Sequence, residues 1–299
     1  MATLTFFDDP RDFLARADWH LRQNPVLNTV VATYSERLVA EIDDGVYPDE
    51  VDHPRWWVVV TDHAGEVVGA GMRTAPFEPH PPFLLAMPDD AAVELARVLH
   101  ERGETLAGVN GALPGTRLCA EETARLTGGS ADVVIHTRLF ELDELVPPRP
   151  AVGSLRLATA VDAELALQWF EEFMIAADEQ AGREPGSGHD QVETIEGMLR
   201  RIELGRIWFW EDEAGERVHM TGANPPSYGA ARVGPVFTPV EHRGRGYASA
   251  AVAEISQLIL DDGNTPCLFT DQANPTSNGI YQALGYRPVV DMTNILIHS

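Results

Sequence analysis

The chain has 299 residues, of which 44% are hydrophobic, and a formal net charge of −24. This acidity argues against nucleic-acid binding and against contact with anionic membrane surfaces, and no apolar run approaches the roughly 18 residues of a transmembrane helix. Two cysteines are too few for a disulfide framework or a thiolate metal site, and the ten histidines lack metal-binding spacing, so we expect no metal. The acidic N-terminus has no signal-peptide pattern, which predicts a cytoplasmic protein.

A pattern D-x-A-G-E-x-V occurs twice, at 62–68 and at 212–218, with an offset of 150 residues. Each occurrence follows an apolar run that contains tryptophan, at 56–60 and at 207–210, and each predicts a β-hairpin with Ala-Gly in its turn. The offset is half the length of the chain, which favours two related domains over chance similarity. We place the boundary in the stiff connector 147–150, Pro-Pro-Arg-Pro, so the predicted domains are 1–147 and 151–299.

Residues 233–255 predict a strand, a glycine loop and a helix, in that order. Such a loop directs backbone N–H groups and the positive end of a helix dipole at one spot, which suits a phosphate or pyrophosphate. A P-loop is excluded, because all 22 basic residues are arginine and the motif requires lysine. A dinucleotide fingerprint is a near miss, with Ser249 in place of its third small residue and Asp261 and Asp262 too close to serve as its acidic residue. An ordinary turn with solvated arginines is the remaining alternative.

The stretch 265–289 predicts a buried strand at Cys267–Thr270, a turn at Asn274-Pro275 and a short helix. Ser277 or Asn278 is the expected helix cap, and Gly285 is the expected helix end.

Two motifs carry a family resemblance. Arg243-x-x-Gly246-x-Ala248 resembles the [RQ]-x-x-G-x-[GA] loop of the Gcn5-related N-acetyltransferase (GNAT) superfamily, and 274–286 resembles its second signature, N-x-x-[SA]-x-x-x-Y-x-x-x-G-[FY]. The resemblance implies an α/β fold of two tandem GNAT-like domains, each a mostly antiparallel sheet flanked by helices. It also implies acetyl-CoA as co-substrate.

The resemblance further assigns a role to each matching position. Tyr281 would be catalytic, giving a proton to the departing thiolate, and a tyrosine stays protonated at neutral pH. Its alternative role is core packing, and Asn274 could be only a turn residue. The residues implied to bind acetyl-CoA are Val236, Phe237, Thr238, Arg243, Gly244, Arg245, Gly246, Tyr247, Ala248, Asn274 and Ser277.

The first hairpin is followed by a sequence without the loop. Met87-Pro88 align with Thr238-Pro239. A predicted helix start at Asp89 and Asp90 follows them directly. Two carboxylates there would repel a pyrophosphate. The N-terminal domain is therefore interpreted as a degenerate GNAT copy that does not hold CoA in the usual way.

The expected activity is transfer of an acetyl group to a primary amine of a small molecule or peptide; the alternative is a non-catalytic acyl-CoA-binding or regulatory protein. No motif fixes the general base. Loop 182–189 is either a substrate lid or an ordinary surface loop. The candidates for the base, each also readable as a surface or core residue, are Glu171, Glu172, Asp178, Glu179, His219 and Glu241.

Overall fold

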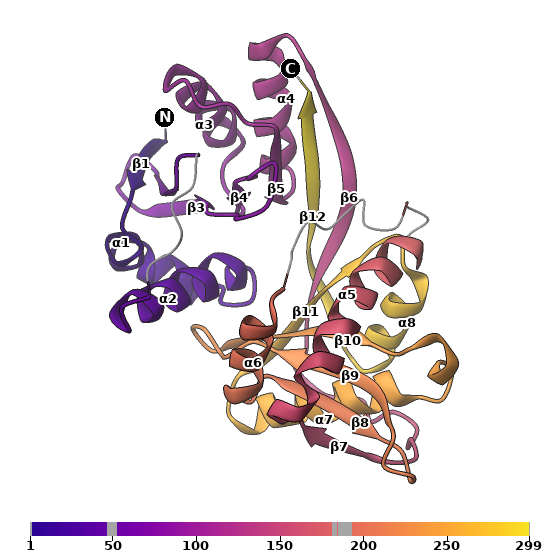
Figure 1. Ribbon diagram of the computed structural model, residues 1–299. Helices are drawn as coiled ribbons and strands as arrows, with labels where there is room; N and C mark the ends of the chain where they lie inside the picture. The colour runs from indigo at the N-terminus through magenta and orange to yellow at the C-terminus, as the bar shows by residue number, and fades with distance from the viewer. Residues whose placement is uncertain (1, 47–52, 181–183, 185–192, 299) are drawn as a thin grey trace. The chain divides into compact units, whose positions relative to one another are not determined.

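The computed structural model describes residues 2–46, 53–180, 184 and 193–298. Apart from two short 3-10 segments, η1 and η2, one order of strands and helices occurs twice (Figure 1). The first copy consists of β1 (Thr3–Phe7), α1 (Pro10–Gln23), α2 (Thr29–Asp43), β2 (Trp56–Thr61), β3 (Val67–Arg73), β4 (Phe83–Leu84), α3 (Asp89–Glu101), β5 (Gly108–Ala112), α4 (Gly115–Thr127) and β6 (Ser130–Glu141). The second copy consists of β7 (Ser154–Leu157), η1 (Ala160–Asp162), α5 (Ala163–Gln180), α6 (Ile195–Glu203), β8 (Ile207–Glu211), β9 (Arg217–Ala223), β10 (Ala230–Phe237), η2 (Val240–His242), α7 (Tyr247–Asp261), β11 (Thr265–Asp271), α8 (Pro275–Ala283) and β12 (Arg287–His298).

The two predicted hairpins are confirmed and match in detail. β2 pairs antiparallel with β3 and β8 with β9, and each pairing has a register irregularity one residue before its end. In the turns, the Asp62 carboxylate accepts hydrogen bonds from two backbone N–H groups at 2.9 Å, and Asp212 does the same at 2.9 and 3.0 Å. Gly65 and Gly215 take positive φ angles of 83° and 78°, which glycine adopts without strain.

In the first copy, helices cover both faces of the strands. Val58 and its neighbours on alternate positions of β2 pack against Leu95 of α3 and Ala120 of α4. The intervening Trp57 faces the other way, where Phe13 of α1 lies with its ring centroid 6.4 Å away. Figure 1 shows α3 on one side of β1 and β3, and α1 and α2 on the other. This division follows from the alternation of side chains along a strand.

A buried ion pair also stabilises the first copy. The guanidinium of Arg73 lies 3.0 Å from the carboxylate of Glu104, and both side chains are at most 5% exposed. Trp56 donates to the same carboxylate oxygen at 2.8 Å, and Arg102 approaches the other oxygen at 3.0 Å. Because an unpaired charge is costly to bury, the members of this group depend on one another.

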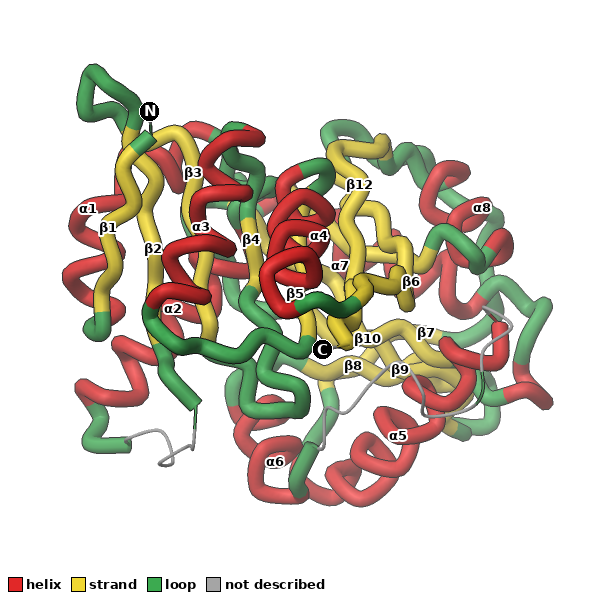
Figure 2. The backbone as a smooth tube through the Cα atoms, turned by 90° about the horizontal axis from the view of Figure 1, so that it is seen from above, coloured by secondary structure: helices red, strands yellow, loops and turns green. Residues whose placement is uncertain are grey.

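In the second copy, α5 and α6 lie together on one side of β8 and β9 (Figure 2). Trp169 of α5 and Met198 of α6 pack there against Phe209, Met220 and Phe237. Helix α7 covers the opposite face, where its apolar side chains meet those of β9 and β10; the residues in that contact are Ala223, Val233, Val252 and Ile255.

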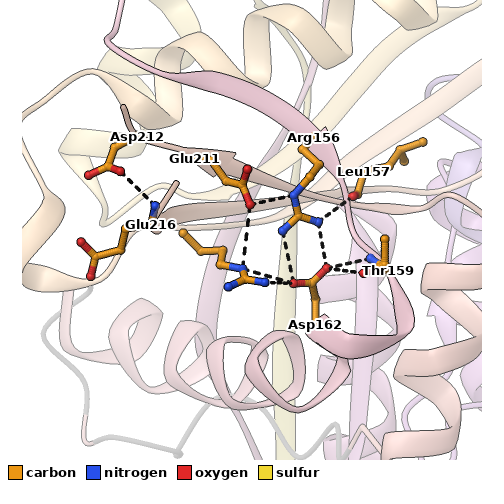
Figure 3. A network of polar contacts seen from close by, with 8 residues as sticks. Arg156, Leu157, Thr159, Asp162, Glu211, Asp212 and Glu216 are labelled. Carbon is orange, nitrogen blue, oxygen red and sulfur yellow. Dashed lines mark hydrogen bonds and ion pairs between the residues drawn. The ribbon is translucent and has the colours of Figure 1, made fainter. Parts of the chain in front are cut away.

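An arginine–carboxylate network joins β7, β8 and β9 at one end of the strand order (Figure 3). Asp162, at the end of η1, accepts from Arg156 of β7 at 2.8 Å and from Arg217 of β9 at 2.8 Å, and Arg156 also donates to Glu211 of β8 at 2.7 Å. Burial alone would raise the pKa of the Asp162 carboxyl. The hydrogen bonds from Arg156, Thr159 and Arg217 outweigh burial and hold that pKa well below its usual range.

The compact units do not follow the copies along the chain. One unit is Met1–Thr137 with Val290–Ser299, and the other is Arg138–Val289. Inside the first unit, β12 pairs antiparallel with β5, in a register that places Met292 opposite Ala112. Strand β6 stands next to β11 in the strand order, and Leu142 donates to the carbonyl of Pro266 in the second unit. Each copy thus gives part of its last strand to the other unit, an exchange that the predicted bounds 1–147 and 151–299 do not include.

No helix in the described part of the chain is long and apolar enough to cross a membrane. The described residues also contain no group of three metal-binding side chains.

Candidate functional site

The site begins where β10 separates from β11. The parallel pairing of these strands covers Ala230–Arg232. Beyond it, β10 continues beside β9, with a register irregularity between Val233 and Val236. The first copy differs at the matching place, because β4 and β5 remain paired through Leu84 and Gly111. The end of β10 therefore has a free edge toward β11, where its backbone groups can meet a ligand.

The loop after β10 has the backbone geometry of an anion site. Gly244 and Gly246 adopt φ angles of 77° and 86°, and Gly246 caps the N-terminus of α7. A Cβ added at Gly246 would meet nothing closer than 3.9 Å, so the left-handed backbone, rather than lack of space within the chain, requires glycine here. The first copy has no such loop, since α3 begins at Asp89, directly after Pro88.

Two exposed arginines flank Gly244. Arg243 donates through Nε to the carbonyl of Thr238 at 3.0 Å, and Arg245 donates to the carbonyl of Glu241 at 3.2 Å. Among the described residues, neither guanidinium is paired with a carboxylate. Their remaining N–H groups are free to bind a phosphate.

A pocket of about 360 Å³ opens between the loop, the end of β10, α5 and α8. It brings together all twelve residues that the sequence predicted for the cofactor and for catalysis, from Val236 to Tyr281. The roles of these residues remain predictions. Sequence reasoning missed seven further lining residues, Phe173, Ala176, Ala177, His242, Ser249, Thr276 and Ile280.

Tyr281 lies in the wall of this pocket on α8 and is 7% exposed. Burial raises the pKa of its hydroxyl well above the ordinary value, so the group stays protonated. Its ring also packs edge-on against Tyr286, with centroids 6.0 Å apart. Within the described chain its hydroxyl has no hydrogen-bond partner, which leaves it available to a ligand.

The cap of α8 differs from the prediction. The helix begins at Pro275, and Asn274, rather than Ser277 or Asn278, caps it by accepting from the backbone N–H of Ser277 at 3.1 Å. Asn274 was expected as a cofactor ligand, and the structure gives its side-chain oxygen this local partner as well. Asn278 instead donates to the carbonyl of Asn274 at 2.7 Å.

The candidate bases lie in different places. Glu172, Glu179 and Glu241 line a second pocket of about 580 Å³, which shares Phe237 and Arg243 with the first. Glu171 is exposed, whereas Asp178 is buried.

His219 is fully buried on β9, and burial lowers the pKa of its ring to about 3. Loop 182–189 lies outside the described residues except for position 184.

Comparison with known proteins identifies which fold the chain has. Residues 222–294 match the family described as FR47-like protein, a GNAT-like family. No curated protein matches the chain in sequence.

Three solved structures are similar over nearly the whole chain. A Drosophila protein has a TM-score of 0.66 and 13% identity, covering 98% of both chains. A tandem GNAT protein from the clavulanic acid biosynthesis pathway has a TM-score of 0.55 and 13% identity, covering 100% of this chain and 98% of its own. A GNAT-family acetyltransferase from Colwellia psychrerythraea has a TM-score of 0.53 and 12% identity, covering 99% and 100%. The chain therefore has the fold of the GNAT acetyltransferases, as two such domains in tandem, and its residues 222–294 match a GNAT-like family.

Proposed function

We propose that the second copy transfers an acetyl group from acetyl-CoA to a primary amine of a small molecule or peptide. The observation that carries this proposal is the pocket in which the glycine loop, Tyr281 and two arginines meet, neither arginine being paired with a carboxylate of the described residues. The GNAT fold and the acetyltransferases among its structural relatives support it.

In this proposal the loop and strand hold the co-substrate. Arg243, Arg245 and the N–H groups at the start of α7 bind the pyrophosphate. The free edge at the end of β10 bonds the pantetheine arm, and a backbone N–H between Val236 and Thr238 polarises the thioester oxygen.

The reaction requires the net transfer of one proton from the amine nitrogen to the leaving sulfur. The amine nitrogen attacks the thioester carbon, so a C–N bond forms and the C–S bond breaks. The Tyr281 hydroxyl gives its proton to the leaving sulfur, and the proton lost by the amine returns to Tyr281 through water. Tyr281 suits this role because it lines the pocket and its hydroxyl is protonated at neutral pH.

One observation favours the second candidate, a non-catalytic acyl-CoA-binding protein. The described residues that line the cofactor pocket include no aspartate or glutamate, so none of them supplies a carboxylate base in that pocket. Deprotonation by the carboxylates of the neighbouring pocket or by ordered water would answer this objection.

Two measurements separate the candidates. Calorimetry with acetyl-CoA tests binding, and release of free CoA thiol during incubation with polyamines, aminoglycosides, amino acids and peptides tests transfer. We expect binding and amine-dependent release of thiol, both weakened in Arg243→Ala. The control is Arg287→Ala, which removes an exposed arginine that pairs with Asp143. Binding without release for any amine class would favour the non-catalytic candidate, and no binding would refute both.

A further inference from the structure

His219 links the interior of the second copy to the cofactor pocket. Its ring lies on β9 and is 0% exposed. Nδ1 is 2.7 Å from the hydroxyl oxygen of Thr238, and Nε2 is 2.5 Å from that of Thr221. Thr221 is also fully buried, whereas Thr238 lines the pocket. The three side chains therefore form a short chain with one end at the site.

The ring in this chain is neutral. Burial lowers its pKa to about 3, far below neutral pH. A neutral imidazole has one N–H and one lone pair, so it donates to one neighbour and accepts from the other. The Thr221 and Thr238 hydroxyls must therefore take opposite roles, and neither rotates freely. Because the ring does not line the pocket, it cannot take a proton directly from a bound amine.

Thr238 is held at a second point, since its carbonyl accepts from Arg243 at 3.0 Å. A threonine hydroxyl can form up to three hydrogen bonds, so the bond to His219 leaves capacity toward the pocket. Nearby polar groups are partly engaged, because the Asn274 side chain already bonds the Ser277 backbone. The Thr238 hydroxyl, held by His219, therefore offers the pocket a side-chain hydrogen-bonding group at the end of β10.

We propose that His219 is a positioning residue of the cofactor pocket, which holds the Thr238 hydroxyl in the orientation that bonds the pantetheine arm of a bound acyl-CoA. This inference rests on the proposed function, because that function supplies the ligand. It removes His219 from the candidate bases and gives it a role in binding.

The test uses the different reach of two amides. In His219→Asn the amide lies near the position of Nδ1 and keeps a bond to Thr238, whereas in His219→Gln it lies near Nε2 and keeps the bond to Thr221. Calorimetry with acetyl-CoA should show binding weakened by about 2- to 12-fold in His219→Gln and in Thr238→Val, the range of one hydrogen bond. The double variant should bind no more weakly than Thr238→Val alone. His219→Asn, Thr238→Ser and the control Thr221→Val should stay within about twofold of the wild type.

Other results would overturn the inference. Wild-type affinity in both His219→Gln and Thr238→Val, with only a lower free energy of unfolding, would show that the hydrogen bonds of His219 stabilise the fold and do not position Thr238 for binding. Equal loss in His219→Asn and His219→Gln would show that the Thr238 bond is not what matters. If the histidine variants do not fold, the comparison of Thr238→Val with Thr238→Ser and Thr221→Val decides alone, and equal affinity in all three overturns the inference. Absence of binding in the wild type is a separate result, because it refutes the proposed function first.

Discussion

Arg243 folds back on the strand that precedes it, its Nε donating to the backbone carbonyl of Thr238 over 3.0 Å. One N–H of the guanidinium therefore orders the loop, and the others remain for an anion. The same arginine thus connects the shape of the loop to its affinity for phosphate.

Replacing Arg243 by alanine should weaken acetyl-CoA binding about tenfold or more, because a charge-assisted hydrogen bond is worth roughly 1.5–3 kcal/mol. Calorimetry should also give one site per chain, since the matching place in the first copy has no loop and begins α3 with two aspartates. Two sites per chain, or an unchanged Kd, would contradict this expectation. Arg287→Ala controls for loss of a surface charge.

Gly246→Val should weaken binding further and destabilise the loop by about 1–2 kcal/mol, because its φ of 86° is costly for a β-branched residue. Gly246→Asn is the matched control, since asparagine tolerates this conformation better. Equal loss of acetyl-CoA affinity in Gly246→Asn and Gly246→Val would show that the ligand leaves no room for a side chain at this position. The comparison therefore separates backbone strain from blocked approach.

Tyr281→Phe should lower the rate of acetyl transfer by about 10²–10⁴-fold, the usual contribution of general acid catalysis, with little change in acetyl-CoA affinity. Single-turnover kinetics are the appropriate measurement, because product release can hide the chemical step. Tyr286→Phe is the control: that hydroxyl bonds Ser256 at 2.8 Å inside the core and does not line the pocket. Full single-turnover activity in Tyr281→Phe would assign Tyr281 to packing.

The stability of the protein should fall as the pH falls from about 6.5 toward 3, in part because of His219. In the unfolded chain this histidine binds a proton below its ordinary pKa, whereas in the folded chain it does so only near 3. The unfolded state therefore holds more protons in this window, and the free energy of unfolding decreases by up to about 1.4 kcal/mol per pH unit from this group.

Urea denaturation at several pH values checks the His219 contribution. The slope should be shallower in His219→Gln than in the wild type and unchanged in His63→Gln, which alters an exposed histidine. Equal slopes in the wild type and His219→Gln would show that His219 does not contribute.

Arg73→Met should destabilise the protein by about 3 kcal/mol, the lower end of the range for breaking a buried ion pair. The lower end is expected because Arg102 still lies 3.0 Å from Glu104. Arg22→Ala breaks an exposed pair with Asp18 and should cost less than about 1 kcal/mol. Chemical denaturation measures both, and a similar small cost for both would mean that the Glu104 carboxylate finds other partners.

The local features of the fold could be predicted from the sequence because short-range chemistry determines them. The hairpin turns depend on Asp62 and Asp212 and on glycines that adopt positive φ. The loop depends on Gly244 and Gly246 in the same way. These signals lie within a few residues of the structure that they specify. Two short motifs were therefore enough to predict which residues meet in the cofactor pocket.

The missed residues gave no such signal. Phe173, Ala176 and Ala177 lie on an apolar helix and are indistinguishable in sequence from its core positions. The cap at Asn274 was misplaced by a few residues, because Asn274, Ser277 and Asn278 are all good capping residues. The exchange of β6 and β12 could not be predicted, since alternation along a strand specifies a face and not a partner.

The exchange of strands has a consequence for synthesis on the ribosome. The partner of Ala112 on β5 is Met292 on β12, about 180 residues later in translation. At a translation rate of roughly 5–20 residues per second, this edge of β5 remains unpaired for on the order of 10–40 s. An unpaired strand edge invites association with other chains. The nascent first copy is thus most exposed to aggregation while the second copy is being made, and a chaperone would be most useful in that interval.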